Sequence, residues 1–243
     1  MHISFFVLII LLVLSCGASH HLKSDLIYKD NDFSYDHLKK KGMIIAGISS
    51  KMIEFNHEKR LEYGKSLSNV LLDKLKDVYA IHIINTQQFI SRIGTLKYFD
   101  TMEEFDRENV LSENLMQNVR DTIPDIQYLI IGYIENENIM DDKIEEYVEN
   151  EDGKEVIQTE YEKTYLLTVQ FQIYDIIEGK KSWETVIYNK AKHSETRETR
   201  SGCMESCIDN IFLSLLHGEA AEISREEVLV RIFERLAKNL SKS

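Results

Sequence analysis

One segment of the chain, residues 165–174, alternates apolar and polar side chains more regularly than any other. A period of two residues is that of a β-strand with one apolar face. The turn residues Asp175 and Gly179 follow, and a second apolar stretch around Trp183 comes after them. The segment therefore predicts a β-hairpin, in which two antiparallel strands cover an apolar core with one face.

A strand, a helix and a second strand are predicted earlier in the chain. Residues 43–48 form a short continuous apolar run, typical of a strand that is buried on both faces. A helix follows, with Asn56 as its cap and apolar residues recurring at intervals of three and four over residues 63–78. Residues 79–85 predict the second strand. This order implies a right-handed crossover between parallel neighbours.

The remaining segments predict further helices, a buried strand and an acidic hairpin. Thr86 is a plausible cap of a short helix, and a strand over residues 127–134 contains Gly132, where another part of the chain can approach closely. Residues 136–163 are strongly acidic and predict a solvated hairpin inserted between core strands. We therefore predict an α/β fold, in which residues 41–243 form a single three-layer-like domain with a mixed parallel and antiparallel sheet covered by helices.

The apolar run over residues 5–14 leads through Ser15 to Cys16. This is the layout of a bacterial lipoprotein signal, in which a peptidase cuts before the cysteine and acyl chains are attached to it. Residues 1–15 are then a signal peptide, and the polar residues 16–40 are a flexible tether. The alternatives are an ordinary secretory signal cleaved a few residues further on and an uncleaved hydrophobic tail. The run is shorter than the roughly 20 apolar residues of a spanning helix, so a transmembrane anchor is not expected.

The charge of the chain restricts its partners. The formal net charge is -12, and the leader contributes no charged side chain to it. Such a surface repels phosphate backbones and anionic lipid head groups, which disfavours nucleic-acid partners and electrostatic docking to membranes. We therefore expect the membrane contact to come from acyl chains on Cys16. Gly17 after the cysteine favours the outer membrane under the familiar sorting rule for lipoproteins.

Two further cysteines, Cys203 and Cys207, remain if Cys16 is acylated. In an exported chain they are candidates for a single disulfide, with inert thiols as the alternative. A metal site would need further ligands, and His217 is the only candidate nearby. We expect no metal and no cofactor.

Catalytic motifs are missing from the sequence. It contains no His-Glu-x-x-His zinc motif, no Gly-x-Ser-x-Gly elbow, no phosphate loop and no dinucleotide fingerprint. We therefore expect no enzyme and no catalytic residues. Trp183 and Tyr188 are candidates for a partner surface, and packing in the core or on a sheet face is the alternative for both.

The order of elements resembles that of a group of periplasmic lipoproteins that includes CsgG, LpoB, PelC and the amino-terminal domain of TolB. The resemblance rests on the strand at 43–48, the long helix at 59–77, the strand at 128–134 and the hairpin pattern of Asp175, Gly179 and Trp183, which Tyr174 precedes. It implies a protein that acts through its surfaces. LpoB-like members reach a partner enzyme, PelC-like members assemble into rings, and CsgG-like members add membrane-spanning hairpins that form a secretion pore.

A pore of the CsgG type is disfavoured because the acidic segment 136–163 has no uninterrupted apolar face. The sequence thus predicts a non-catalytic envelope lipoprotein, anchored in the outer membrane and facing the periplasm, that serves as an interaction or assembly module for an envelope protein partner. The alternative is a ring-forming subunit of a CsgG/PelC-like export or secretion assembly, which would be a homo-oligomer. A second alternative is an unrecognised periplasmic hydrolase.

Overall fold

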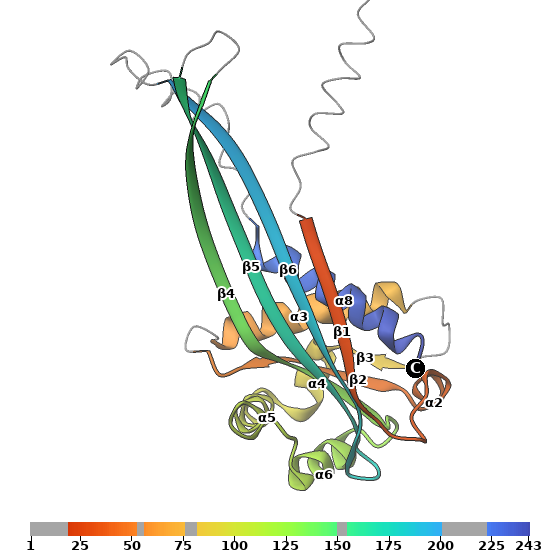
Figure 1. Ribbon diagram of the computed structural model, residues 1–243. Coiled ribbons are helices and arrows are strands. Elements are labelled where there is room, and N and C mark those ends of the chain that lie inside the picture. Colours follow the sequence, from red (N-terminus) through yellow and green to blue (C-terminus); the bar gives the residue numbers. More distant parts are fainter. Residues whose placement is uncertain (1–18, 53–55, 76–81, 150–154, 201–222) are drawn as a thin grey trace, which may run out of the picture. The chain divides into compact units, whose positions relative to one another are not determined.

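A six-stranded sheet with helices on both of its faces forms the described part of the chain (Figure 1). The computed structural model describes residues 19–52, 56–75, 82–149, 155–200 and 223–243, leaving aside the side chains of residues 155, 156 and 195–200. These residues group into two compact units. The first holds residues 19–21, 138–149, 155–166, 190–200 and 223–228, and the second holds residues 22–52, 56–75, 82–137, 167–189 and 229–243.

The strands of the sheet follow the order β1-β6-β5-β4-β2-β3. Strand β2 pairs in parallel with β3 and with β4, so the predicted parallel neighbours are confirmed. The arrows of β4, β5 and β6 alternate in direction, which makes the sheet mixed, as predicted (Figure 1). The strands are β1 (Ser19–Lys29), β2 (Met43–Ser50), β3 (Ile83–Ile84), β4 (Tyr128–Glu149), β5 (Glu155–Asp175) and β6 (Lys180–Arg200).

Gly132 lies where two neighbouring strands bring bulky side chains together. A Cβ atom at this position would lie 2.5 Å from Cδ1 of Ile48 on β2 and 2.9 Å from Cε1 of Phe171 on β5. Real Cβ atoms essentially never come that close to another atom. The close approach predicted at Gly132 is therefore confirmed, and its partners are side chains of the core.

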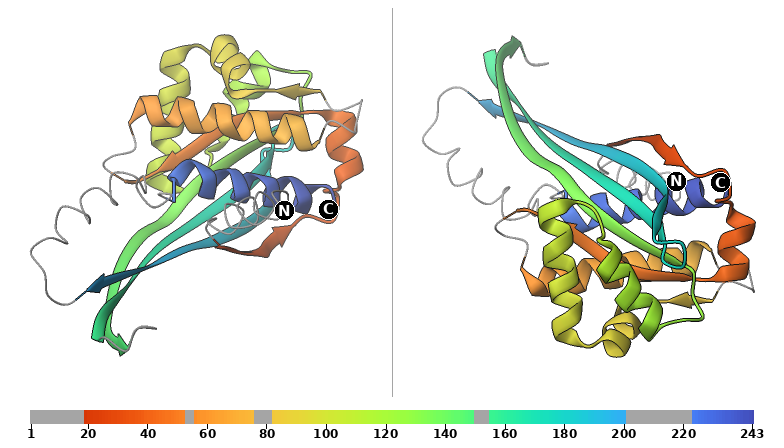
Figure 2. Two further views of the ribbon diagram at one scale, coloured as in Figure 1. Left: turned by 90° about the horizontal axis from the view of Figure 1, so that it is seen from above. Right: turned by 90° about the horizontal axis from the view of Figure 1, so that it is seen from below.

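Helices cover both faces of the sheet within the second unit (Figure 2). Three of them enclose an apolar cluster on one face, where Tyr98, Met102 and Phe105 pack against Ile44 and Ile131 of the sheet. These are α4 (Thr86–Ile93), α5 (Thr95–Glu108) and α6 (Glu113–Thr122).

The opposite face carries α3 (His57–Lys74) and the part of α8 (Arg225–Leu240) that belongs to the second unit. An ion pair of 3.1 Å between Lys74 and Glu234 joins these two helices. Phe233 of α8 meets Phe171 of the sheet edge to face, with 6.2 Å between the ring centroids. The predicted layers of helix, sheet and helix are thus confirmed.

The flexible tether predicted over residues 16–40 is corrected for the described residues 19–40. They form β1, the outermost strand beside β6, and most of α2 (Tyr35–Lys41). The side chains of Phe33 and Leu38 are buried, and Ser34 caps α2 by accepting a hydrogen bond from the backbone N–H of His37. The sequence showed no periodicity here because only a few apolar anchors, spread between charged residues, hold the segment in place.

Several predicted features lie outside the described residues. These are the signal peptide 1–15, Cys16, both cysteines of the proposed disulfide, Cys203 and Cys207, and the turn of the acidic hairpin. Within the described ranges, no helix is both long enough and apolar enough to cross a membrane.

Candidate functional site

The two aromatic residues predicted as a partner surface lie on β6 and differ in exposure. Trp183 is 1% exposed and its ring lies 6.3 Å from that of Phe33, measured between centroids. The prediction of a partner surface is therefore wrong for Trp183, which is a core residue because its strand is covered by the segment between β1 and α2. Tyr188 is half-buried, and its contact with a partner remains a prediction.

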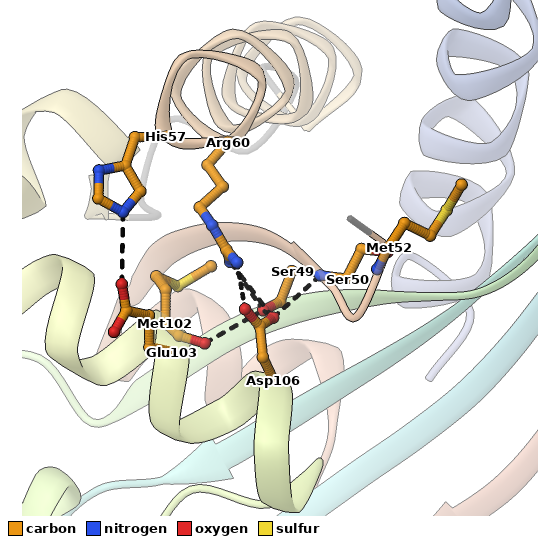
Figure 3. A network of polar contacts seen from close by, with 8 residues as sticks. All are labelled: Ser49, Ser50, Met52, His57, Arg60, Met102, Glu103 and Asp106. Carbon is orange, nitrogen blue, oxygen red and sulfur yellow. Dashed lines mark hydrogen bonds and ion pairs between the residues drawn. The ribbon is translucent and has the colours of Figure 1, made fainter. Parts of the chain in front are cut away.

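A buried ion pair holds the carboxyl end of β2 between two helices of the second unit (Figure 3). Both terminal nitrogens of the Arg60 guanidinium on α3 contact the Asp106 carboxylate on α5, one of them at 3.3 Å from Oδ1. The same carboxylate accepts a hydrogen bond of 3.0 Å from the backbone N–H of Ser50 and contacts the hydroxyl of Ser49. Arg60 also donates to Ser49 Oγ at 3.1 Å.

This network does not assemble a nucleophile with a base. The Ser49 hydroxyl is directed at acceptors, Asp106 and the carbonyl of Met102, and the carboxylate that it contacts is already neutralised by Arg60. The nearest histidine drawn in Figure 3, His57, points to Glu103 at 3.4 Å. Activation of a serine requires a base in hydrogen-bond contact with it. The network therefore fastens β2, α3 and α5 together.

An open groove of about 490 Å³ adjoins Arg60 and is lined by Asn56, His57, Glu58 and Glu103. The His57 ring at this groove stacks on Phe99 with 3.8 Å between the ring centroids. Within the part of the chain that the structure describes, no group of three or more His, Cys, Asp or Glu side chains is arranged to hold a metal ion.

A second polar network lies under the loop that follows α5. Asn109, the left-handed residue that ends α5, donates from Nδ2 to Gln170 Oε1 at 2.7 Å, and its carbonyl accepts from Gln172 Nε2 at 3.1 Å. The Gln172 side chain also contacts the hydroxyl of Tyr174, which accepts a hydrogen bond of 3.2 Å from Leu111 N–H. The polar face predicted for this strand is thus buried, and its hydrogen bonds set the position of α5 on the sheet. Sequence reasoning missed this network because the polar residues alone indicate a solvated face.

The first unit contains the distal ends of three long strands. Between residues 138 and 149 of β4 only Val148 is even partly buried. Exposed apolar side chains occur among the acidic ones, with Ile144 at 51% and Tyr147 at 76% exposed. Usual strands run about 3 to 10 residues, and strands that solvent surrounds on both sides are seldom stable alone. We call residues 138–149, 155–166 and 193–200 the ribbon.

The ribbon has unpaired edges among the described residues. β4 has β5 and β2 as its neighbours, and its pairing with β2 ends where Ser50 meets Ile134. The backbone of β4 beyond Ile134 therefore has a free edge. An exposed edge of unpaired N–H and C=O groups is a template for pairing with another strand.

No protein-family model and no curated protein matches the sequence. Among solved structures, a PelC dodecamer from Paraburkholderia phytofirmans is 11% identical, with a TM-score of 0.35 over 92% of this chain and 98% of that chain. A lipoprotein from Neisseria meningitidis is 8% identical, with a TM-score of 0.32 over 72% of this chain and 97% of that chain. A minor lipoprotein from Acinetobacter baumannii is 10% identical, with a TM-score of 0.24 over 84% and 92%.

PelC and lipoproteins thus stand among the structures similar to this chain, in agreement with the resemblance predicted from the sequence. All three TM-scores are below 0.5, so these likenesses assign no function to this chain.

Proposed function

We propose that the protein is a non-catalytic lipoprotein of the bacterial cell envelope, anchored in the outer membrane through acyl chains on Cys16, that binds an envelope protein partner through the ribbon. The observation that carries this proposal is that, among the described strands, none pairs with the edge of β4 beyond Ile134 on the side of β2. The two polar networks described above, around Asp106 and around Asn109, hold elements of the second unit together. The proposed function therefore lies at the surface of the protein.

The side chains of the ribbon suit a contact with a partner strand. Ile139, Ile144 and Tyr147 are all at least half exposed, and acidic residues separate them. Charged residues keep an exposed edge from pairing indiscriminately. Apolar side chains on the same strand supply the area that a specific partner buries. This mixture of exposed apolar and acidic side chains therefore fits a selective contact with a partner better than it fits a hairpin that is only solvated.

A triple substitution of exposed apolar residues tests the role of the ribbon. The variant Ile139→Ser, Ile144→Ser, Tyr147→Ser removes apolar area from β4 without touching the core. Its matched control, Leu61→Ser, Leu96→Ser, Val110→Ser, removes exposed apolar area from the second unit. Cells expressing each tagged variant are treated with a cleavable crosslinker, and the species joined to the protein are compared.

The ribbon variant should lose crosslinked species that the natural chain and the control both retain, with unchanged thermal unfolding of the purified protein. Equal crosslinking of all three proteins would show that the ribbon makes no partner contact.

A second candidate function is that of a subunit in a ring, in which copies pair through their ribbons. β4 beyond Ile134 is strongly acidic, whereas the sequence of the last part of β6 balances Glu195 and Glu198 with Arg197 and Arg200. Two β4 edges would place acid against acid, which is unfavourable in a sheet. A contact between β4 of one copy and β6 of the next avoids this repulsion, and such head-to-tail contacts generate rings or filaments.

Light scattering on the lipid-free Cys16→Ser protein decides between these candidates. A ring predicts a mass several times that of one chain, and Arg197→Glu with Arg200→Glu should lower it. A monomer at all concentrations, together with the loss of crosslinks in the ribbon variant, would leave only the envelope partner.

A further inference from the structure

A cavity of about 240 Å³ lies in the second unit, where the end of β1, the start of β4 and the turn between β5 and β6 come together. Phe33 and Tyr128 form its aromatic wall, with their rings edge to face and 5.5 Å between centroids. Both residues are almost fully buried, and Tyr128 is only 3% exposed. The cavity is smaller than the roughly 300 to 1,000 Å³ of drug-sized ligand pockets. It therefore suits a group the size of one side chain.

The charges around the cavity are predominantly negative. Four carboxylates line it, against the ammonium groups of Lys41 and Lys180; they belong to Asp30, Asp32, Asp175 and Glu178. Lys180 is already engaged, since its Nζ lies 2.7 Å from Asp30 Oδ2 and 2.7 Å from Glu178 Oε2. The hydrogen bond from Lys180 holds the pKa of Asp30 below its usual value, so this carboxyl group is ionised at neutral pH.

Two of the carboxylates differ in what they contact. Asp175 is saturated by the turn that it builds, because it accepts hydrogen bonds of 2.9 Å from the backbone N–H groups of Ile177 and Glu178 and a further one from Gln127. The carboxylate of Asp32, by contrast, has no hydrogen-bond or ion-pair partner among the described residues, and it is exposed at the cavity. Asp32 is thus available to a ligand.

The hydroxyl of Tyr128 is a second polar group that is available at the cavity. It has no hydrogen-bond partner within the described ranges, although its residue is buried. Burial and the nearby carboxylates of Asp175, Glu178 and Asp30 raise the pKa of Tyr128 to about 12. The hydroxyl oxygen is not completely enclosed, so a ligand in the cavity can reach it.

An aromatic wall, an unpaired hydroxyl and an excess of carboxylates together match one kind of group. A guanidinium is planar, stacks on aromatic rings and presents several N–H donors to carboxylate and hydroxyl oxygens. We propose that this cavity binds the guanidinium of an arginine side chain presented by a partner protein, with Tyr128 and Asp32 accepting its hydrogen bonds. This site lies wholly in the second unit and does not depend on the ribbon.

The protein carries its own reporter for this site. Trp183 is the only tryptophan of the chain, and its ring packs against Phe33 of the cavity wall. Titration of the lipid-free Cys16→Ser protein with N-acetyl-arginine amide should change the tryptophan fluorescence saturably, and calorimetry should give the same dissociation constant. The uncharged isostere N-acetyl-citrulline amide should not bind, and N-acetyl-lysine amide should bind about tenfold more weakly, since it lacks the planar fork.

Three variants connect the binding to the cavity. Tyr128→Phe should weaken binding of the arginine amide about tenfold, because a hydrogen bond to a charged group is lost. Asp32→Asn should weaken it about threefold, since the attraction of an exposed carboxylate is screened by solvent. The control Asp36→Asn changes an acid on α2 that pairs with Lys39 and does not line the cavity, so it should leave the affinity unchanged.

Circular dichroism and thermal unfolding verify that Tyr128→Phe is folded, and Asp32→Asn remains decisive if it is not, because Asp32 is exposed. Equal binding of the citrulline or lysine amide would overturn the assignment of a guanidinium. No binding of the arginine amide, or an affinity that Asp32→Asn does not alter, would overturn the site itself.

Discussion

Asp106 compensates a buried charge, so its removal should destabilise the second unit. It compensates the buried Arg60 guanidinium and accepts the backbone N–H of Ser50, so its substitution leaves a buried cation without its carboxylate. Breaking such a pair from one side costs about 3 to 5 kcal/mol. We expect Asp106→Asn to lower the free energy of unfolding by about 3 kcal/mol in urea denaturation.

The double variant Arg60→Met, Asp106→Leu is the control for this prediction, because it removes both charges and fills their space with apolar atoms. It should recover most of the loss. If Asp106→Asn had the same free energy of unfolding as the natural chain, the ion pair of Arg60 and Asp106 would not stabilise the second unit.

Tyr174 makes the stability of the fold sensitive to alkaline pH. Burial raises the pKa of this residue and that of Tyr128 to about 12 from the usual value of 10.0. Between these values the unfolded chain loses tyrosine protons that the folded chain keeps. The folded state then binds more protons, so the free energy of unfolding falls as the pH rises from about 10 to about 12.

The variant Tyr174→Phe should make this alkaline decline shallower, because one of the buried groups no longer titrates. At neutral pH it should lose about 1 kcal/mol, since Leu111 N–H no longer has its acceptor. Urea denaturation at pH 7, 10 and 11 measures both effects. An unchanged slope in Tyr174→Phe would show that other groups cause the decline.

At the scale of the elements, Gly132 allows β2, β4 and β5 to approach closely. Gly132→Ala places a methyl group against Ile48 and Phe171, and overpacking of this kind costs about 1 to 3 kcal/mol. Adding Ile48→Val removes the closest atom, so the double variant should be more stable than the sum of the two single changes predicts. Urea denaturation of all four proteins gives this coupling, and strict additivity would contradict the steric account.

The elements that the sequence predicted well depend on local signals. Asn56 caps α3, as its position before an apolar periodicity indicated, through a hydrogen bond of 3.0 Å from Lys59 N–H. For α4 the predicted cap, Thr86, is wrong, because Asn85 forms a capping box with Gln88. The hydroxyl of Thr86 instead donates toward the carbonyls of Ile45 and Gly64, contacts that no local pattern encodes.

Features formed by distant residues could not be predicted in this way. Arg60 and Asp106 are 46 positions apart in the chain, and neither belongs to a motif. The same holds for the cavity between β1, β4 and the β5–β6 turn, whose carboxylates come from two places in the sequence about 140 positions apart, around residue 30 and around residue 176. Strand β1 was missed because an edge strand needs only a few apolar side chains when β6 supplies its hydrogen-bonding partner.

At the scale of the whole molecule, Cys16 is predicted to decide whether the protein stays with the membrane. No helix of the described residues can span a bilayer, and the net charge of -12 disfavours anionic lipid. Cys16→Ala should therefore move the protein from the membrane fraction to the soluble fraction and abolish labelling with palmitate. Cys203→Ala is the matched control. Membrane association and labelling of Cys16→Ala equal to those of the natural chain would refute lipidation.

The early start of β1 changes how such an anchored protein would search for its partner. Ser19 is already part of this strand, and only three positions separate it from Cys16. Three residues span at most about 11 Å, far less than a free tether over residues 16–40 would allow. With acyl chains on Cys16, the folded chain would remain at the lipid surface and diffuse within its plane. Encounters would then be two-dimensional, and a partner would need to lie at the same membrane to be captured.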